Sequence, residues 1–422
     1  PAIGGIGKGH IVFEIAALGG LMPELCTQTY LQVRMLNTTK GPAVHGLRLQ
    51  IDKNAYSEES QKRLSQVAHL TIIEAMAEEL LVDDNKVIRG VRLADGTILK
   101  TATAVLTTGT FLNGLVHIGL ENYPSGREDE KPVINLTQSL RNLGLTLGRL
   151  KTGTPPRLLR SSLDFSKMDK QESEKLDYLF EFYPHTTTPK LDCYITHTNE
   201  RVHEIILENA HLSRILRKEI SGVGPRYCPS IEDKITRFPE KKSHQIFVEP
   251  ESASTDWMYP NGLSTSLPLS AQTAYIQAIK GFENAVIVRP GYAIEYDFVL
   301  PHQLKQTLEV KTVPGLFLAG QINGTTGYEE AAGQGIVAGI NASLTAHKED
   351  PFIQDVVKKT MSMKAQWAGW TDEAWHAPER AKAAAALVKA KGGEKGLKKY
   401  AAVVMEIAST VARAYGEYGA ID

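Results

Sequence analysis

Cysteine is scarce in this sequence. The 422 residues include three cysteines, Cys26, Cys193 and Cys228, and no two of them have the Cys-x-x-Cys spacing. Such a set forms neither a disulfide framework nor a structural zinc site, since both need closely spaced or paired thiols. We therefore expect no metal centre and a reducing compartment, which is the cytoplasm or, in a eukaryote, the mitochondrion.

Long apolar runs and a surplus of one charge are also missing. No run approaches the roughly 20 residues that span a bilayer, so no membrane association is expected. With 47 Lys and Arg against 48 Asp and Glu, the composition lacks the basic surplus that usually accompanies nucleic-acid binding. Residues 1–10 have neither an initiator Met nor the basic-then-apolar build of a secretory signal, and we expect that the natural chain begins upstream.

The length and the apolar pattern indicate a globular α/β protein of two or three domains. After the opening glycines, periodicity and turn signals predict, in order, a helix over 11–18, an amphipathic helix over 57–69, a short strand over 70–73, strands over 87–93 and 97–100 joined by a turn at 94–96, and a buried strand over 104–107. A second strand and helix are predicted at 315–319 and 329–343.

The spacing of these segments predicts a discontinuous domain. We expect a FAD-binding Rossmann-like domain formed by residues 1–112 and 300–348, interrupted by an inserted mixed α/β region at 113–299. That region is rich in Pro, Gly and Ser but keeps apolar positions throughout, so it is predicted to be folded and to serve the substrate or a nicotinamide nucleotide. Residues 349–422 are rich in Ala and Lys and are predicted to form a short helical tail.

Four glycines, Gly4, Gly5, Gly7 and Gly9, surround Lys8 just before the first predicted helix. Glycine lets backbone N–H groups approach a phosphate, and the N-terminus of a helix favours negative charge. The alternative is a flexible loop without a ligand. Neither a Walker motif nor a GxGxxG fingerprint is present, so a dinucleotide site would depend on further segments.

Two further segments fit such a site. One is the hairpin and strand that end at Gly109-Thr110. The other is the strand that ends at Gly320-Gln321 and leads through Gly327 into a helix rich in Ala and Gly. Small residues let the helix backbone lie close to a cofactor. Each segment alone also occurs in ordinary β-meanders or close-packed helices, but their order along the chain is that of flavoproteins.

Longer segments carry a more specific signal. The stretches PAIGGIGKGH, GRLKTGTPPR, ITHTNERVHEII, GVGPRYCPSIEDKITRF and AGQINGTTGYEEAAGQG occur in this order. Over roughly residues 1–346 the chain resembles the MnmG (GidA) family of flavoenzymes that modify tRNA. The resemblance implies a cytoplasmic homodimer that binds FAD and works with the GTPase MnmE. It also implies that NADH and methylene-tetrahydrofolate are used to build a carboxymethylaminomethyl or aminomethyl group at C5 of the wobble uridine.

The resemblance also assigns roles to residues. FAD would lie along the opening glycine loop, Ala77, Gly109-Thr110 and Gly320-Gln321. Residues 224–238, including Gly224, Pro225, Arg226 and Tyr227, match a stretch that binds nicotinamide nucleotide. Lys8, Lys40, Arg149, Lys151 and Arg157 lie in or beside Gly- or Pro-rich loops and would contact phosphate of the cofactor or tRNA, or else be solvated surface charges.

Cys228 is the candidate nucleophile. C5 of uracil reacts poorly until a nucleophile adds at C6, which a thiolate does well. Arg226 and Lys234 lie near Cys228 in the sequence and would lower its pKa. In the family this cysteine is one of two implicated in the reaction, and the second lies upstream of Pro1. Cys26 and Cys193 have no such counterpart, and we expect both to be packing residues.

Two other functions remain open on the sequence. A folate- and FAD-dependent tRNA uridine-54 methyltransferase shares the FAD domain, although the ITHTNER and GPRYCPSIEDK blocks favour wobble-uridine modification. A non-catalytic tRNA-binding scaffold is the alternative of another class, since no phosphate-binding GxGxxG is present. The Ala/Lys-rich tail does not match the long helical tail of the family, so binding of tRNA and of MnmE has no support from that segment.

Overall fold

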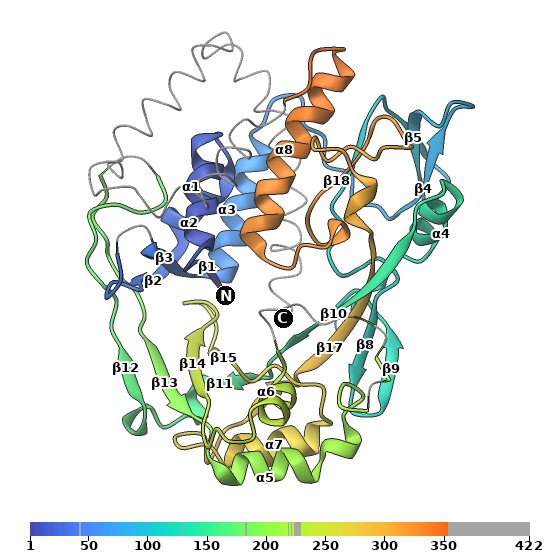
Figure 1. Ribbon diagram of the computed structural model, residues 1–422. Helices are drawn as coiled ribbons and strands as arrows, with labels where there is room; N and C mark the ends of the chain where they lie inside the picture. The colour runs from blue at the N-terminus through green and yellow to red at the C-terminus, as the bar shows by residue number, and fades with distance from the viewer. Residues whose placement is uncertain are drawn as a thin grey trace.

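A computed structural model describes residues 1–352 apart from 42–43, 128, 182–183, 218, 221 and 223–228. Elements from the two ends of this part lie in the upper half of Figure 1, and most of the inserted region lies below them. The predicted helical tail falls almost wholly outside the described residues.

The N-terminal unit is a small antiparallel sheet covered by helices. Its elements are β1 (Ala2–Gly4), α1 (Lys8–Ala17), α2 (Leu21–Thr29), β2 (Tyr30–Leu36), β3 (Gly46–Ile51) and α3 (Lys53–Ser65), with strand order β1-β3-β2. Val12, Leu25 and Leu49 are fully or almost fully buried in its core. Helix α3 begins four residues before the predicted start at 57, because the Asp52 side chain caps it by accepting from the N–H of Ala55. Among the described residues no single helix is long and apolar enough to cross a bilayer, and α1 with α2 reaches that composition only as a pair bent by 115°.

The predicted meander is confirmed, with one error before it. Strands β4 (Ala77–Val82), β5 (Ile88–Leu93) and β6 (Ile98–Lys100) form an antiparallel sheet, followed by β7 (Ala104–Leu106). The strand predicted over 70–73 is wrong, since these residues belong to no helix or strand and Ile72 and Ile73 are 45% and 47% exposed. The partner of β5 is instead the segment that begins at Ala77, where Leu80 is buried against α4 (Asn135–Asn142).

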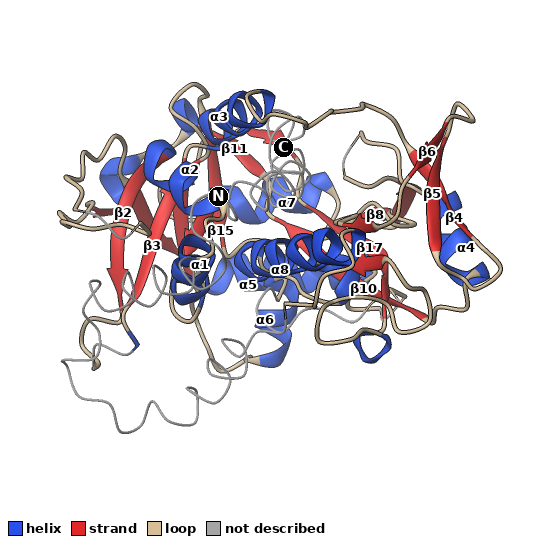
Figure 2. Cartoon of the chain, turned by 90° about the horizontal axis from the view of Figure 1, so that it is seen from above, coloured by secondary structure: helices blue, strands red, loops and turns tan. Residues whose placement is uncertain are grey.

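Strand β7 joins the two parts of the discontinuous fold. It pairs in parallel with β18 (Leu316–Leu318), more than 200 residues later, with Val105 opposite Phe317. The helix predicted after β18 is α8 (Tyr328–Ala346), which packs against both β18 and α1 (Figures 1 and 2). Parallel strands need a crossover connection, and here the connection is the whole inserted region. The fold is therefore the predicted discontinuous Rossmann-like α/β fold with a mixed insertion.

The inserted region contains two antiparallel sheets. The four-stranded sheet has the order β10-β17-β8-β9, formed by Leu147–Thr154, Tyr292–Val299, Leu115–Ile118 and Glu121–Pro124. The six-stranded sheet has the order β12-β13-β14-β15-β11-β16, formed by Asp169–Gln171, Cys193–His197, Gln245–Pro250, Trp257–Asn261, Arg157–Leu159 and Ile287–Arg289. Helices α5 (Glu200–Glu208), α6 (Ile231–Arg237) and α7 (Leu269–Gln277) share a core with the second sheet, in which Val202, Ile235, Val248 and Tyr275 are buried.

Candidate functional site

The predicted flavin segments meet where β7 and β18 end. Gly109 follows β7, and Gly320 opens the short 3-10 helix η6 (Gly320–Asn323) after β18. A Cβ atom on Gly109 would lie 3.5 Å from Oε1 of Gln321, so the two segments are neighbours. Because the paired strands are parallel, their carboxyl ends lie at one edge, where open α/β sheets bind ligands. Gly109 and Gly320 have φ of 55° and 82°, the left-handed region that favours glycine.

The opening glycine loop contains two kinds of glycine. Gly4 and Gly9 pack against Leu47, and a Cβ on Gly9 would come within 2.7 Å of the Leu47 carbonyl oxygen. Counting only the described residues, Gly7, which precedes α1, has no neighbouring atom within 4 Å of its Cβ position, and Gly5 has only the Leu36 side chain at 3.7 Å. The first pair therefore serves packing, whereas Gly5 and Gly7 leave space beside the loop.

A buried carboxylate joins this loop to α8. Glu329 is 1% exposed, accepts from the Gly4 N–H at 2.7 Å and lies 2.9 Å from Nζ of Lys8. Glu330 lies 3.7 Å from the same ammonium. Partial burial opposes the charge of Lys8, but the carboxylates of Glu329 and Glu330 outweigh it and raise the pKa of Lys8. Lys8 is therefore a fixed cation, already engaged by protein carboxylates.

Buried oxygens near the strand ends have the chemistry of a polar ligand site. Among the described residues, Oγ1 of Thr107, Thr108 and Thr325 and Oδ1 of Asn323 are buried without a hydrogen-bond partner. Leaving such atoms unpaired is costly, and they follow β7 or lie between β18 and α8. Together with the space at Gly5 and Gly7, they fit an extended ligand rich in hydroxyl and phosphate groups, such as FAD.

Other predicted residues are placed as follows. A side chain on Gly327, which precedes α8, would collide with Glu330 and Lys8. Thr110 directs its hydroxyl to the carbonyl oxygen of Gly126 at 2.6 Å, so its side chain serves the local structure. Ala77 begins β4 and pairs with Leu93 in the meander, which lies to the right of β18 in Figure 1.

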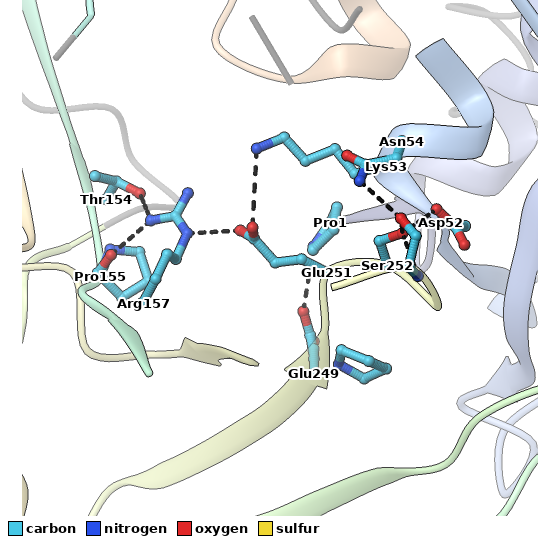
Figure 3. Close-up of polar contacts among 12 residues, drawn as sticks. Pro1, Asp52, Lys53, Asn54, Thr154, Pro155, Arg157, Glu249, Glu251 and Ser252 are labelled. Carbon is cyan, nitrogen blue, oxygen red and sulfur yellow. Dashed lines mark hydrogen bonds and ion pairs between the residues drawn. The ribbon is translucent and has the colours of Figure 1, made fainter. Parts of the chain in front are cut away.

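Arg157 is not a solvated surface charge, and its contact with phosphate stays a prediction. Its guanidinium is buried and donates to Oε1 of Glu251, to Oγ1 of Thr154 and to the carbonyl oxygen of Pro155, each at 2.6 Å (Figure 3). Lys53 of α3 approaches the other oxygen of Glu251 at 3.9 Å. This cluster holds the N-terminal unit against the inserted region.

Two further predicted cations are also engaged by carboxylates. Arg149 donates to Oδ1 of Asp297 at 2.7 Å, and Nζ of Lys151 lies 3.3 Å from Oδ2 of Asp233. Lys151 is buried and Arg149 is mostly covered, so the alternative of a solvated surface charge was wrong for both, and their contact with phosphate stays a prediction. Strands β10 and β17 and helix α6 bring both cations next to aspartates with which they form ion pairs. The loop-like sequence around each cation did not indicate these partners.

The loop that contains Cys228, with Gly224, Pro225, Arg226 and Tyr227, lies outside the described residues. Its described flanks are anchored. The Gly222 N–H donates to Oε1 of buried Glu295 at 2.7 Å, and Glu295 also contacts Nε2 of His117 at 2.9 Å. On the other side, Ser230 caps α6 by accepting from the Asp233 N–H.

The two described cysteines are packing residues. Cys26 and Cys193 are both buried, and burial raises the pKa of Cys193 to about 12. Within the described part of the chain, no three His, Cys, Asp or Glu side chains are close enough to hold a metal ion.

Comparisons with known proteins point in one direction. The family model for glucose inhibited division protein A matches residues 1–350. The chain is 50% identical over 354 residues to the tRNA uridine 5-carboxymethylaminomethyl modification enzyme MnmG of Thermodesulfovibrio yellowstonii, covering 84% of this chain and 57% of the relative. It is similar to GidA of Aquifex aeolicus in two crystal forms, with TM-scores of 0.80 and 0.79 at 47% and 45% identity, covering 84% of this chain and 60% and 58% of those chains. The chain thus spans less than two thirds of the length of these relatives.

Proposed function

Because the chain belongs to the glucose inhibited division protein A family, we propose that it is the flavin-binding part of an enzyme that modifies C5 of the wobble uridine in tRNA. The observation that carries the proposal is the meeting of Gly109 with Gln321 at the shared edge of β7 and β18. The name of the curated relative supplies the substrate and the reaction.

FAD is the proposed cofactor, and residues on α1, β7, β18 and α8 would hold it. Gly5 and Gly7 leave room beside it. The orphaned hydroxyls of Thr107, Thr108 and Thr325 would donate hydrogen bonds to it or accept them from it, and Oδ1 of Asn323 would accept one. When bound, a flavin would supply hydride-transfer chemistry and exchange reducing equivalents with NADH.

The chain's own residues would shape this site. Beside the opening glycine loop, Glu329 and Glu330 balance the ammonium of Lys8, so the N-terminus of α1 is the part of this loop that favours anionic groups. The buried side chain of Tyr296 on β17 lies next to Gln321, and burial raises the pKa of its hydroxyl, which keeps it protonated. Cys228 is the proposed nucleophile toward C6 of the uracil.

The remaining elements of the proposal concern partners. We propose a homodimer that works with the GTPase MnmE in the cytoplasm, or in the mitochondrion of a eukaryote, and that uses NADH and methylene-tetrahydrofolate. Residues 224–227 are the proposed contact for the nicotinamide nucleotide. The domain boundaries at 112/113, 299/300 and 348/349 remain predictions.

Analysis of tRNA nucleosides tests the proposed function. We expect that tRNA from cells lacking wobble modification, incubated with the protein, MnmE, GTP, FAD, NADH, methylene-tetrahydrofolate and an amine donor, gains carboxymethylaminomethyl- or aminomethyl-uridine at the wobble position. Mass spectrometry of mapped fragments identifies the product and its position. Methylation at uridine 54 would contradict the proposal in favour of the methyltransferase, and tRNA binding without flavin or product would favour a scaffold.

A further inference from the structure

Helix α8 contacts two glycine loops of the proposed flavin site through two side chains. One is the opening glycine loop, and the other is the turn at Gly320 after β18. Glu329, in its first turn, accepts from the Gly4 N–H and pairs with Lys8. One and a half turns later, Oε1 of Gln334 accepts from the Gly320 N–H at 2.9 Å and lies 3.3 Å from Nδ2 of Asn323. The two loops are more than 300 residues apart in the sequence, and both are held by one helix.

The contact of Glu329 with Gly4 and Lys8 is a strong one. Glu329 is almost completely buried, and a carboxylate in that position is stable only when its charge is balanced and its oxygens are hydrogen-bonded. One oxygen takes the Gly4 N–H and the other the Lys8 ammonium, which satisfies both. Charge-assisted hydrogen bonds of this kind are about twice as strong as neutral ones.

The second contact fixes a position that requires glycine. Gly320 has φ of 82°, and its Cβ position lies only 3.3 Å from Cβ of Ala331 on the same helix. Because Gln334 holds the N–H of this glycine, the turn after β18 is fixed relative to α8. The same amide oxygen also orients Asn323, whose Oδ1 has no hydrogen-bond partner among the described residues.

We propose that Glu329 and Gln334 are positioning residues that set the separation of the two glycine loops, so that the flavin site is preformed before any cofactor binds. The inference rests on the proposed function, since it assigns these side chains a role in flavin affinity. Neither is proposed to touch the reacting atoms. A preformed site avoids the cost of ordering loops during binding, so loss of either contact lowers affinity.

Hydrogen–deuterium exchange of the flavin-free protein tests the preformed geometry, and a flavin titration tests its consequence. Glu329→Gln removes the charge that pairs with Lys8. In this variant we expect the exchange rate of the peptide containing Gly4 and the Kd for flavin each to rise about tenfold. In Gln334→Met, we expect the peptide containing Gly320 to exchange faster and Kd to rise about threefold, as for loss of one neutral hydrogen bond.

Matched variants separate positioning from general damage. Glu204→Gln removes a charge from the exposed face of α5, where Glu204 pairs with Arg201 at 3.0 Å, and is expected to leave exchange near Gly4 and flavin Kd within twofold of wild type. Lys8→Arg should retain affinity, whereas Lys8→Met should lose it, because only the former keeps the cation beside Glu329. This second pair keeps the test informative if Glu329→Gln folds poorly.

The outcomes are distinct. Faster exchange with unchanged flavin Kd overturns the inference and leaves the flavin site in place. Unchanged exchange in both Glu329→Gln and Gln334→Met also overturns it. Absence of flavin binding by the wild-type protein overturns the proposed function, and with it the inference.

Discussion

Replacing Cys228 with serine is expected to reduce uridine modification by on the order of 10³-fold or more while flavin stays bound. The reason is the chemistry of the uracil ring, whose C5 becomes nucleophilic only after addition at C6. A serine hydroxyl is nearly the same size as a thiol but is hardly ionised at neutral pH, whereas cations such as Arg226 and Lys234, near Cys228 in the sequence, would favour the thiolate. The measurement is modified uridine formed per flavin-loaded, folded protein.

Cys193 provides the matched control for this substitution. It is buried, and its pKa of about 12 keeps the thiol protonated, so Cys193→Ser should lower stability but leave turnover per folded protein unchanged. Normal turnover of Cys228→Ser, once corrected for folded protein, would reduce Cys228 to a packing residue and leave the reaction without its proposed nucleophile.

Replacing Arg157 with methionine is expected to lower the free energy of unfolding by about 3 kcal/mol or more, as for other buried ion pairs that lose one partner. The substitution leaves Glu251 buried, with Lys53 at 3.9 Å as its remaining side-chain cation in Figure 3. It also removes the guanidinium that stacks 4.6 Å above the ring of Tyr259. Denaturant unfolding gives the difference in free energy, with Arg201→Met, on the exposed face of α5, expected to change it by less than about 0.5 kcal/mol.

The same cluster predicts a dependence on pH. Burial alone would raise the pKa of Glu251, but Arg157 and Lys53 outweigh burial and lower it. The folded-state pKa is thus below the unfolded value of about 4.3, so the stabilisation is fully present above that pH and is lost as pH falls through the folded-state pKa. A free energy of unfolding for Arg157→Met equal to that of wild type at neutral pH would contradict this account of the interface.

The sequence was most informative where one residue type is required by local geometry. Gly109 and Gly320 follow strands and adopt positive φ, and the order of their two segments, which is that of flavoproteins, predicted that the segments meet. The meander was equally predictable, because the turn at 94–96 and the alternation around it are local signals. The short apolar run at 70–73 failed because a strand also needs a partner, and no local pattern identifies one.

The partners of charged residues were not predictable. Lys8 was correctly placed beside a helix N-terminus, but its partner Glu329 lies 321 residues away. Arg157 looked like a loop cation, yet the fold buries it against Glu251. Such pairs depend on which segments the tertiary structure brings together, and neither residue type nor periodicity encodes that. The orphaned oxygens of Thr107 and Thr325 were hidden for the same reason, although threonines flanking each glycine segment were a usable signal.

A flavin titration of Gly320→Val against Gly96→Val tests the central claim most directly. Both glycines have positive φ, 82° and 86°, so valine causes similar backbone strain at each. Gly96 lies in the turn between β5 and β6 with open space around its Cβ position, whereas Gly320 faces Ala331 at the edge where β7 and β18 end. The account predicts that Gly96→Val binds FAD like the wild-type protein and that Gly320→Val has lost binding. Equal flavin affinity of the two folded variants would contradict it.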